Sequence, residues 1–181
     1  MKLRTGQLLN VTGMNRERFN GTNRDGNLPF YVSNDDRVSS WASFSPTDAF
    51  KLRLMIELMG GDHSDAQIKL LARFACRVVQ NAIGYAETDD PTHFAKATQP
   101  IFLGAAEFSD TSAKGDISFR AAWFCGPISA FERWVDAQNA EGKLYGETVL
   151  NRMVLVNATE AAKHVLGKIA ALGLTDEEPG K

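Results

Sequence analysis

The first apolar stretch of the chain has the spacing of a short amphipathic helix. Leu8, Leu9 and Val11 fall on one face of such a helix. Thr5 is a suitable N-cap, because its hydroxyl can accept a hydrogen bond from a free amide of the first turn, and Gly13 suits the residue after a helix end. A short helix is therefore predicted between Thr5 and Gly13.

A second short helix is predicted after a tight turn over residues 12–14. Asn15 can cap a helix over residues 16–25, and Gly26 followed by Pro29 stops it. Two short helices joined in this way form the helix-turn-helix pattern, in which the second helix enters the major groove of DNA. The groove accepts one helix, so residues near the start of that helix can reach base edges and phosphates.

The next segment has the composition of a β-hairpin. Residues 30–33 and 38–44 are rich in aromatic and β-branched residues, and the polar stretch 34–37 between them suits a turn. A hairpin over residues 30–44, placed directly after a helix-turn-helix, is interpreted as a wing.

Two longer helices are predicted after the hairpin. Ser45 can cap the first of them, with Pro46 at the first helical position and Asp48 reaching back in a capping box, and the glycines 60–61 end it. Apolar residues at helical spacing then predict a helix of about six turns within residues 64–87.

The remaining pattern predicts strands and helices in mixed order. We expect strands at 100–108, 117–125 and 152–156, the last of them buried, and a break in the chain at residues 126–127. We also expect a helix at 128–135 and a second one from the cap Asn157 toward Leu172. The fold class is therefore α+β, with a smaller C-terminal part made of a short β-sheet and flanking helices.

Length and charge agree with this division. A chain of 181 residues makes one large or two small domains, and we expect a DNA-binding domain at 1–71, a dimerisation or effector domain at 72–175 and a flexible tail at 176–181. The net charge is -2, yet residues 1–53 carry eight basic and five acidic side chains. Basic charge thus gathers where the helix-turn-helix pattern lies, which suits either a polyanionic partner or an ordinary solvated surface.

Candidate catalytic and metal-binding residues are sparse. Cys76 and Cys125 lie far apart in apolar segments, which suits reduced core thiols better than a disulfide, and His63, His93 and His164 are isolated from one another. There is no glycine-rich phosphate loop after a strand and no nucleophile with a neighbouring base. We therefore expect no enzymatic activity, no cofactor and no metal.

The start of the chain bears on its location. The first residues lack the apolar core of a signal peptide, and no stretch is long and apolar enough to span a bilayer. A cytoplasmic protein that does not bind membranes is expected.

Three segments resemble the DNA-binding domain of MerR-type regulators. Residues 13–29 are similar to its second helix and the following Leu-Pro, residues 44–52 to the helix after its wing, and residues 61–68 to its next short helix. The resemblance covers residues 5–71, under half the chain. It implies a winged helix-turn-helix that binds double-stranded DNA.

The resemblance is incomplete in the second helix. Family members carry an Arg followed by an aromatic residue in the middle of this helix, where residues 20–23 read Asn-Gly-Thr-Asn. Gly21 inside a helix costs about 1 kcal/mol relative to Ala. It either allows the backbone to approach DNA closely or marks a weaker helix.

The candidate contacts follow from this arrangement. Arg16 and Arg18 can bind guanine or phosphate from the first turn, and Asn20 and Asn23 can read adenine or contact the backbone. Arg37 at the wing tip would meet phosphate or the minor groove. The full set of candidate DNA-binding residues is Thr5, Asn15, Arg16, Arg18, Asn20, Asn23, Arg24 and Arg37. Phe19, Leu28, Tyr31 and Trp41 are expected in the core that holds the wing in place.

The sequence therefore favours a sequence-specific transcriptional regulator. A homodimer is expected, because two-fold pairing matches the inverted repeats that such proteins read. A small molecule or a protein sensed by the C-terminal half is a further candidate partner. An architectural or adaptor protein, similar to an excisionase or a phage packaging factor, and a domain that binds protein without DNA remain as alternatives.

Overall fold

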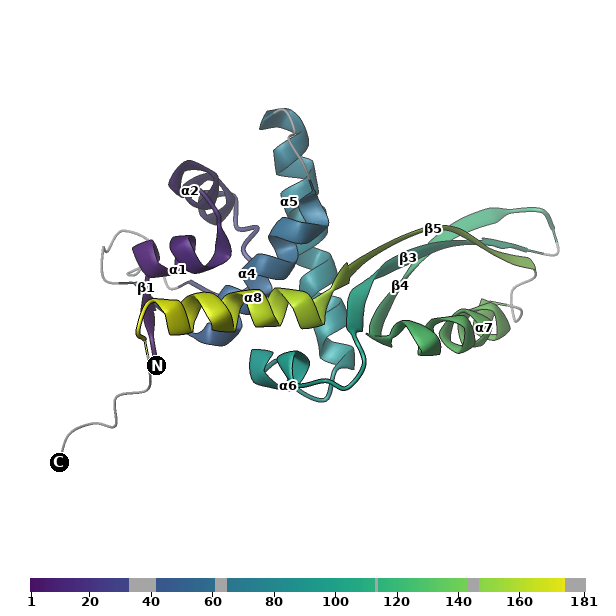
Figure 1. The fold of residues 1–181 in the computed structure, drawn as a ribbon. Helices are drawn as coiled ribbons and strands as arrows, with labels where there is room; N and C mark the ends of the chain where they lie inside the picture. The colour runs from purple at the N-terminus through teal and green to yellow at the C-terminus, as the bar shows by residue number, and fades with distance from the viewer. Residues whose placement is uncertain (33–41, 61–64, 113, 143–146, 175–181) are drawn as a thin grey trace.

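The chain folds into a body of helices from which a three-stranded antiparallel sheet extends, a mixed α+β architecture (Figure 1). The computed structural model describes residues 1–32, 42–60, 65–112, 114–142 and 147–174. In chain order its elements are β1 (Leu3–Arg4), α1 (Thr5–Thr12), α2 (Arg16–Arg24), β2 (Ser43–Phe44), α4 (Pro46–Met59), α5 (Asp65–Ala82), the 3-10 helix η1 (Ile83–Tyr85), α6 (Pro91–Ala95), β3 (Ile101–Thr111), β4 (Ile117–Pro127), the 3-10 helix η2 (Ile128–Ala130), α7 (Phe131–Gly142), β5 (Glu147–Asn157) and α8 (Ala158–Ala171).

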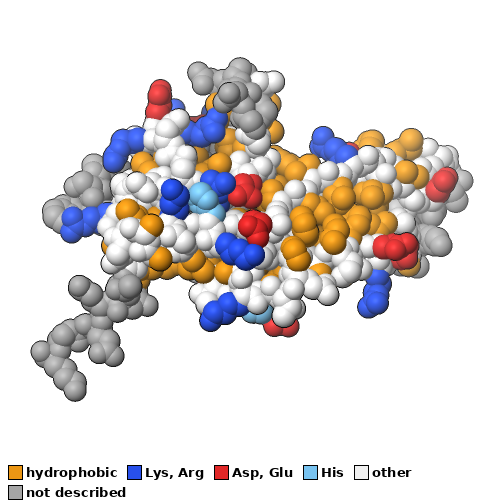
Figure 2. Space-filling view, viewed as in Figure 1, with side chains coloured by type: hydrophobic (Ala, Val, Ile, Leu, Met, Phe, Trp, Pro, Cys, Tyr) orange, Lys and Arg blue, Asp and Glu red, His pale blue; other side chains and the backbone are white. Residues whose placement is uncertain are grey.

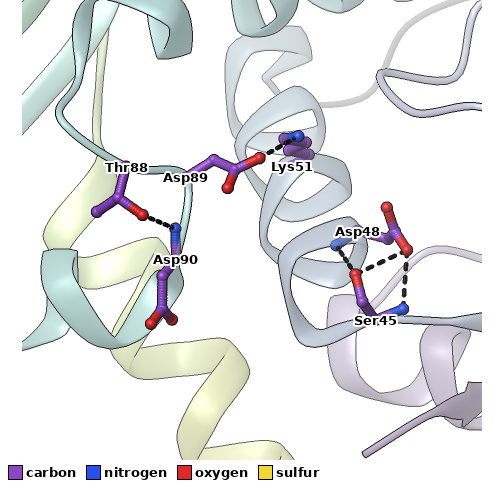
Figure 3. Close-up of polar contacts among 6 residues, drawn as sticks. All are labelled: Ser45, Asp48, Lys51, Thr88, Asp89 and Asp90. Carbon is purple, nitrogen blue, oxygen red and sulfur yellow. Dashed lines mark hydrogen bonds and ion pairs between the residues drawn. The ribbon is translucent and has the colours of Figure 1, made fainter.

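Side-chain caps define several helix starts as predicted. The Asn15 side chain accepts a hydrogen bond from the amide of Arg18, and Asn157 does the same for Glu160 at the start of α8. Ser45 and Asp48 form a reciprocal capping box, drawn in Figure 3. These bonds satisfy amides that have no partner within the helix itself.

The start of α1 differs by one residue from the prediction. Arg4, not Thr5, is its N-cap, and the Arg4 amide donates to the Gln7 side chain at 2.8 Å. The reason is that Leu3 and Arg4 are held extended by pairing with Phe44 and Ser43, so the helix begins directly after the strand.

One continuous hydrophobic core joins the two halves of the sequence. It includes Leu3 and Leu8 from the N-terminal segment together with Val165 and Ile169 from α8, all at most 4% exposed. Helix α8 packs against α4, α6 and α1. The division of the chain near residue 71 stays a prediction, but apolar burial crosses it.

The expected wing is not seen as a hairpin in the described residues. Phe30–Val32 are not in a strand, and Ser43–Phe44 pairs with Leu3–Arg4 instead of with 30–33. The rest of the expected hairpin, residues 33–41 with Arg37 and Trp41, lies outside the described residues. Phe19 and Leu28 are buried as predicted, whereas Tyr31 is 85% exposed, so its assignment to the core was wrong.

The C-terminal sheet has the order β4-β3-β5 with all neighbours antiparallel. Helix α7 covers one face through a small core of Ala106, Phe108 and Ala122, against which Trp134 and Val135 pack. All three strands run longer than predicted, and β4 continues through Gly126 to Pro127, where a break was expected.

Two further C-terminal predictions need correction. β5 is an edge strand in which only Val156 is buried, so the expected buried strand was wrong. The helix expected at 128–135 begins as η2 and continues as α7 to Gly142.

Polar contacts tie the helical body together at α6. Lys51 on α4 forms an ion pair with Asp89 at 2.6 Å (Figure 3). Asp90 caps α6 by accepting from the Thr92 amide at 2.8 Å. In the part of the chain that the structure describes, no helix is long and apolar enough to cross a membrane.

Candidate nucleic-acid interface

A tight turn of three residues joins α1 to α2. Gly13 has φ +78°, and its amide donates to the Leu9 carbonyl at 2.9 Å, which ends α1. The buried hydroxyl of Thr12 donates to the Leu8 carbonyl at 2.8 Å. Asn15 then starts α2 through a 2.7 Å bond from the Arg18 amide. The path between the two helices is therefore fixed by short local hydrogen bonds.

The inner face of α2 anchors it to the body. Phe19 and Thr22 are 4% and 6% exposed. The Phe19 ring meets the Phe44 ring edge-on with centroids 6.0 Å apart, and Phe30 packs against Phe44 in turn at 5.8 Å. Such edge contacts between aromatic rings add to the burial of apolar area. The orientation of α2 is thus set by Phe19.

The outer face of α2 carries polar and basic side chains. Arg16, Asn20 and Arg24 are exposed and follow one another at four-residue intervals, so they lie on one face of the helix. With Glu17 and Gly21 they line one shallow surface recess. A side chain in this row can reach outward without crossing another element.

A groove separates α2 from α5. It has a volume of about 630 Å³, and Arg18 lines it from α2 while Ile68, Lys69 and Ala72 line it from α5. Lys69 lies 3.4 Å from Asp25 at the end of α2, and this ion pair crosses the groove. Arg18 is therefore half-buried beside α5, and Arg24 at the end of the outer row lines the same groove.

The remaining predicted contacts lie apart from the outer face of α2. Thr5 is half-buried in the first turn of α1, and Asn23 lines a separate recess with Leu28 and Gln80. Arg37 lies outside the described residues. The structure thus brings together Arg16, Asn20 and Arg24, with Asn15 at the start of the same helix.

The electrostatics of α2 favour an anion at its outer face. Arg16 and Arg18 form no ion pair within the described residues, and Arg24 has only a 4.0 Å contact with Asp25. Glu17 lines the same recess as this row and was not counted among the candidate contacts from sequence. A carboxylate in a groove can accept a hydrogen bond from cytosine N4, so its presence there is compatible with base reading.

Arg53 on α4 supports the turn from beneath. Its guanidinium donates to the Thr12 carbonyl at 3.1 Å and pairs with Glu57 at 2.8 Å. The Thr12 carbonyl belongs to the last turn of α1, where carbonyls have no partner within the helix. Arg53 thereby connects the end of α1 to α4, a role that the sequence pattern did not indicate.

His164 on α8 lies in the same region. Burial, with the charges of Arg53 and Lys168, lowers its pKa, and these effects outweigh a hydrogen bond with the backbone of Val11 and the charge of Glu57. A neutral imidazole is therefore favoured beside the end of α1. In Figure 2, charged and His side chains gather over the helical body, and hydrophobic ones gather over the sheet and α7.

The described residues hold no group of three His, Cys, Asp or Glu side chains that could bind a metal ion. Cys76 and Cys125 are free thiols, and burial raises the pKa of both, that of Cys125 to about 11. The Cys76 thiol lies 3.4 Å from the Leu28 carbonyl, in the core behind α2. These cysteines fill apolar space, as their sequence context predicted.

Comparison of the chain with protein-family models gives no match, and comparison with curated proteins gives none either.

Proposed function

We propose that the protein is a sequence-specific regulator of transcription whose helix α2 enters the major groove of double-stranded DNA. The observation that carries the proposal is the two-sided character of α2. Phe19 and Thr22 fix its inner face, while Arg16, Asn20 and Arg24 stand exposed in one row on the outer face.

The chemistry of this row fits base reading. Arginine can donate two hydrogen bonds to guanine O6 and N7, and asparagine can pair in the same way with adenine N6 and N7. Arg16 in the first turn is the best placed for a base edge, because α2 is preceded by a tight turn that leaves its start open. Arg24 at the other end would meet a phosphate.

A homodimer belongs to the proposal. One short helix buries little DNA surface, whereas two copies related by a two-fold axis would read an inverted repeat. The C-terminal sheet supports pairing of copies, because the outer strands β4 and β5 each have a free edge within the described residues. The same half of the chain would hold the site for an effector.

The test is selection of bound sequences from a random DNA library at about physiological salt. The expected result is an inverted repeat. Arg16→Ala should weaken binding to the selected site by about 1 to 3 kcal/mol and relax the sequence preference at one position in each half-site. Arg133→Ala, at an exposed position of α7, is the control and should bind like the wild type.

Other outcomes point to other functions. Cooperative binding with weak sequence preference would favour an architectural or adaptor protein. A protein with no salt-sensitive DNA affinity would contradict the proposal and leave a domain that binds other proteins.

A further inference from the structure

One side of α5 carries a row of basic residues. Lys69, Arg73 and Arg77 are exposed and follow one another at four-residue intervals. Four residues correspond to about 6 Å along a helix, so the three charges form a stripe on neighbouring turns. Asp65 is the only acidic residue of α5; it is the first residue of the helix and stands four positions before Lys69.

The stripe begins beside α2. Lys69 lines the groove between α2 and α5 and pairs with Asp25, while Gln80, on the same side of α5, lines the recess that contains Asn23. Arg73 and Arg77 follow Lys69 on the next two turns, displaced from it by about 40° and 80° around the helix axis. The stripe therefore begins at the recess beside α2, the helix proposed to enter the major groove, and continues along α5. Figure 1 shows α5 rising alongside the α1–α2 pair.

Two of the three cations of the stripe are available for an external partner. Arg73 and Arg77 have exposed side chains and form no ion pair within the described residues. Three like charges on adjacent turns of one helix repel each other, which disfavours the folded helix slightly. An anion with regularly spaced charges would relieve this repulsion, whereas a second α5 would add to it.

We propose that Lys69, Arg73 and Arg77, with Arg18 across the groove, bind the phosphodiester backbone of the DNA strand that borders α2. This inference rests on the proposed function, because the DNA strand lies beside α5 only if α2 occupies the major groove. A helix in the major groove has phosphates on either side of it, and contacts to them fix its position without reading sequence. The stripe would contact the phosphates on one side of the major groove, and α5 would thereby fix the position of α2 along the duplex.

The experiment measures the salt dependence of binding to a random-sequence duplex of about 30 base pairs, since phosphate contacts are independent of sequence. Arg73→Gln with Arg77→Gln removes two contacts. Each phosphate contact contributes about 0.9 to the slope of log affinity against log salt, so the slope should fall by about 1.8. The advantage of the wild type over the variant should then be about tenfold larger at 50 mM than at 200 mM salt.

Two controls define the result. Lys114→Gln with Arg133→Gln removes the same charge from exposed positions of the C-terminal half and should keep the wild-type slope. Arg73→Lys with Arg77→Lys retains the charge and should also keep it, which separates charge from any effect on folding.

The outcomes are distinct for the two proposals. A wild type that binds the duplex, with an unchanged slope in the Arg73→Gln/Arg77→Gln variant, would overturn the phosphate role of α5 and leave the proposed function standing. A wild type with no DNA affinity would overturn both.

The stripe adjoins Leu70 and Phe74, which are 72% and 37% exposed. Loss of binding to anionic lipid vesicles in the variant, with DNA affinity unchanged, would instead assign the stripe to a membrane surface.

Discussion

Gly21 gives a test in which stability and binding should move in opposite directions. It lies in the middle of α2, and a Cβ atom built there has no heavy atom within 4 Å. Gly21→Ala should therefore gain the helix propensity of alanine, about 1 kcal/mol, at no steric cost. For a chain of this length that gain corresponds to a rise in Tm of about 2 to 4 °C.

DNA binding should respond in the opposite sense. Gly21 lines both the recess beside Arg16, Asn20 and Arg24 and the groove toward α5, so it lies at the centre of the surface proposed to face DNA. A methyl group there would hold the helix backbone away from the base edges. We expect affinity to fall about tenfold, which is comparable to the loss of one base contact.

Thermal unfolding and fluorescence anisotropy with the selected duplex measure the two effects. Gly167→Ala is the matched control, because Gly167 also lies inside a helix, α8, with open space around it. It should raise Tm similarly and leave DNA affinity unchanged. A Gly21→Ala variant that is less stable than the wild type would refute the account of α2, and one with unchanged affinity would refute the contact surface.

Three further predictions concern the C-terminal half. Gly104→Ala should lower the free energy of unfolding, measured in urea, by about 3 kcal/mol or more, because the added Cβ would overlap the Val154 carbonyl oxygen. A loss of less than about 1 kcal/mol would contradict this close approach. Hydrogen bonds from Thr148 and Arg120 lower the pKa of Asp110, so this carboxylate stabilises the fold above its unfolded pKa and ceases to do so as pH falls through its folded pKa. Asp110→Asn should therefore be less stable than the wild type near pH 7 and should converge with it toward pH 3, and equal stability at both would exclude the effect. Because burial raises the pKa of Cys125 from 9.0 to about 11, its alkylation at pH 8 should be about a hundredfold slower in the native protein than in urea, and equal rates would show an accessible thiol.

Local sequence signals predicted several helix starts correctly. Asn15, Ser45 and Asn157 each cap a helix as expected, since a cap bond joins residues only three positions apart. Gly13 ends α1 for the same kind of reason, because its left-handed conformation is a property of one residue. The α+β class also followed from periodicity, which depends on neighbours within one element.

Long-range pairing was beyond the reach of such signals. The sequence placed Phe44 in a hairpin with residues 30–33, but its strand partner is Leu3, some forty residues away. The exposure of Tyr31 and the edge position of β5 were missed because burial depends on which distant segments pack against a residue, and local composition does not specify them.

The sequence alone therefore determined several helix starts, the inward position of Phe19 in α2, and the concentration of basic residues near the N-terminus. Only the tertiary structure decided that α8 completes the core of the N-terminal helices, that Arg53 holds the end of α1, and that Lys69 lies across a groove from Arg18. The physical reason is the separation along the sequence between the residues that interact. Caps and periodicity arise from interactions within a few residues, whereas the groove and its charges exist only where segments far apart in sequence pack together.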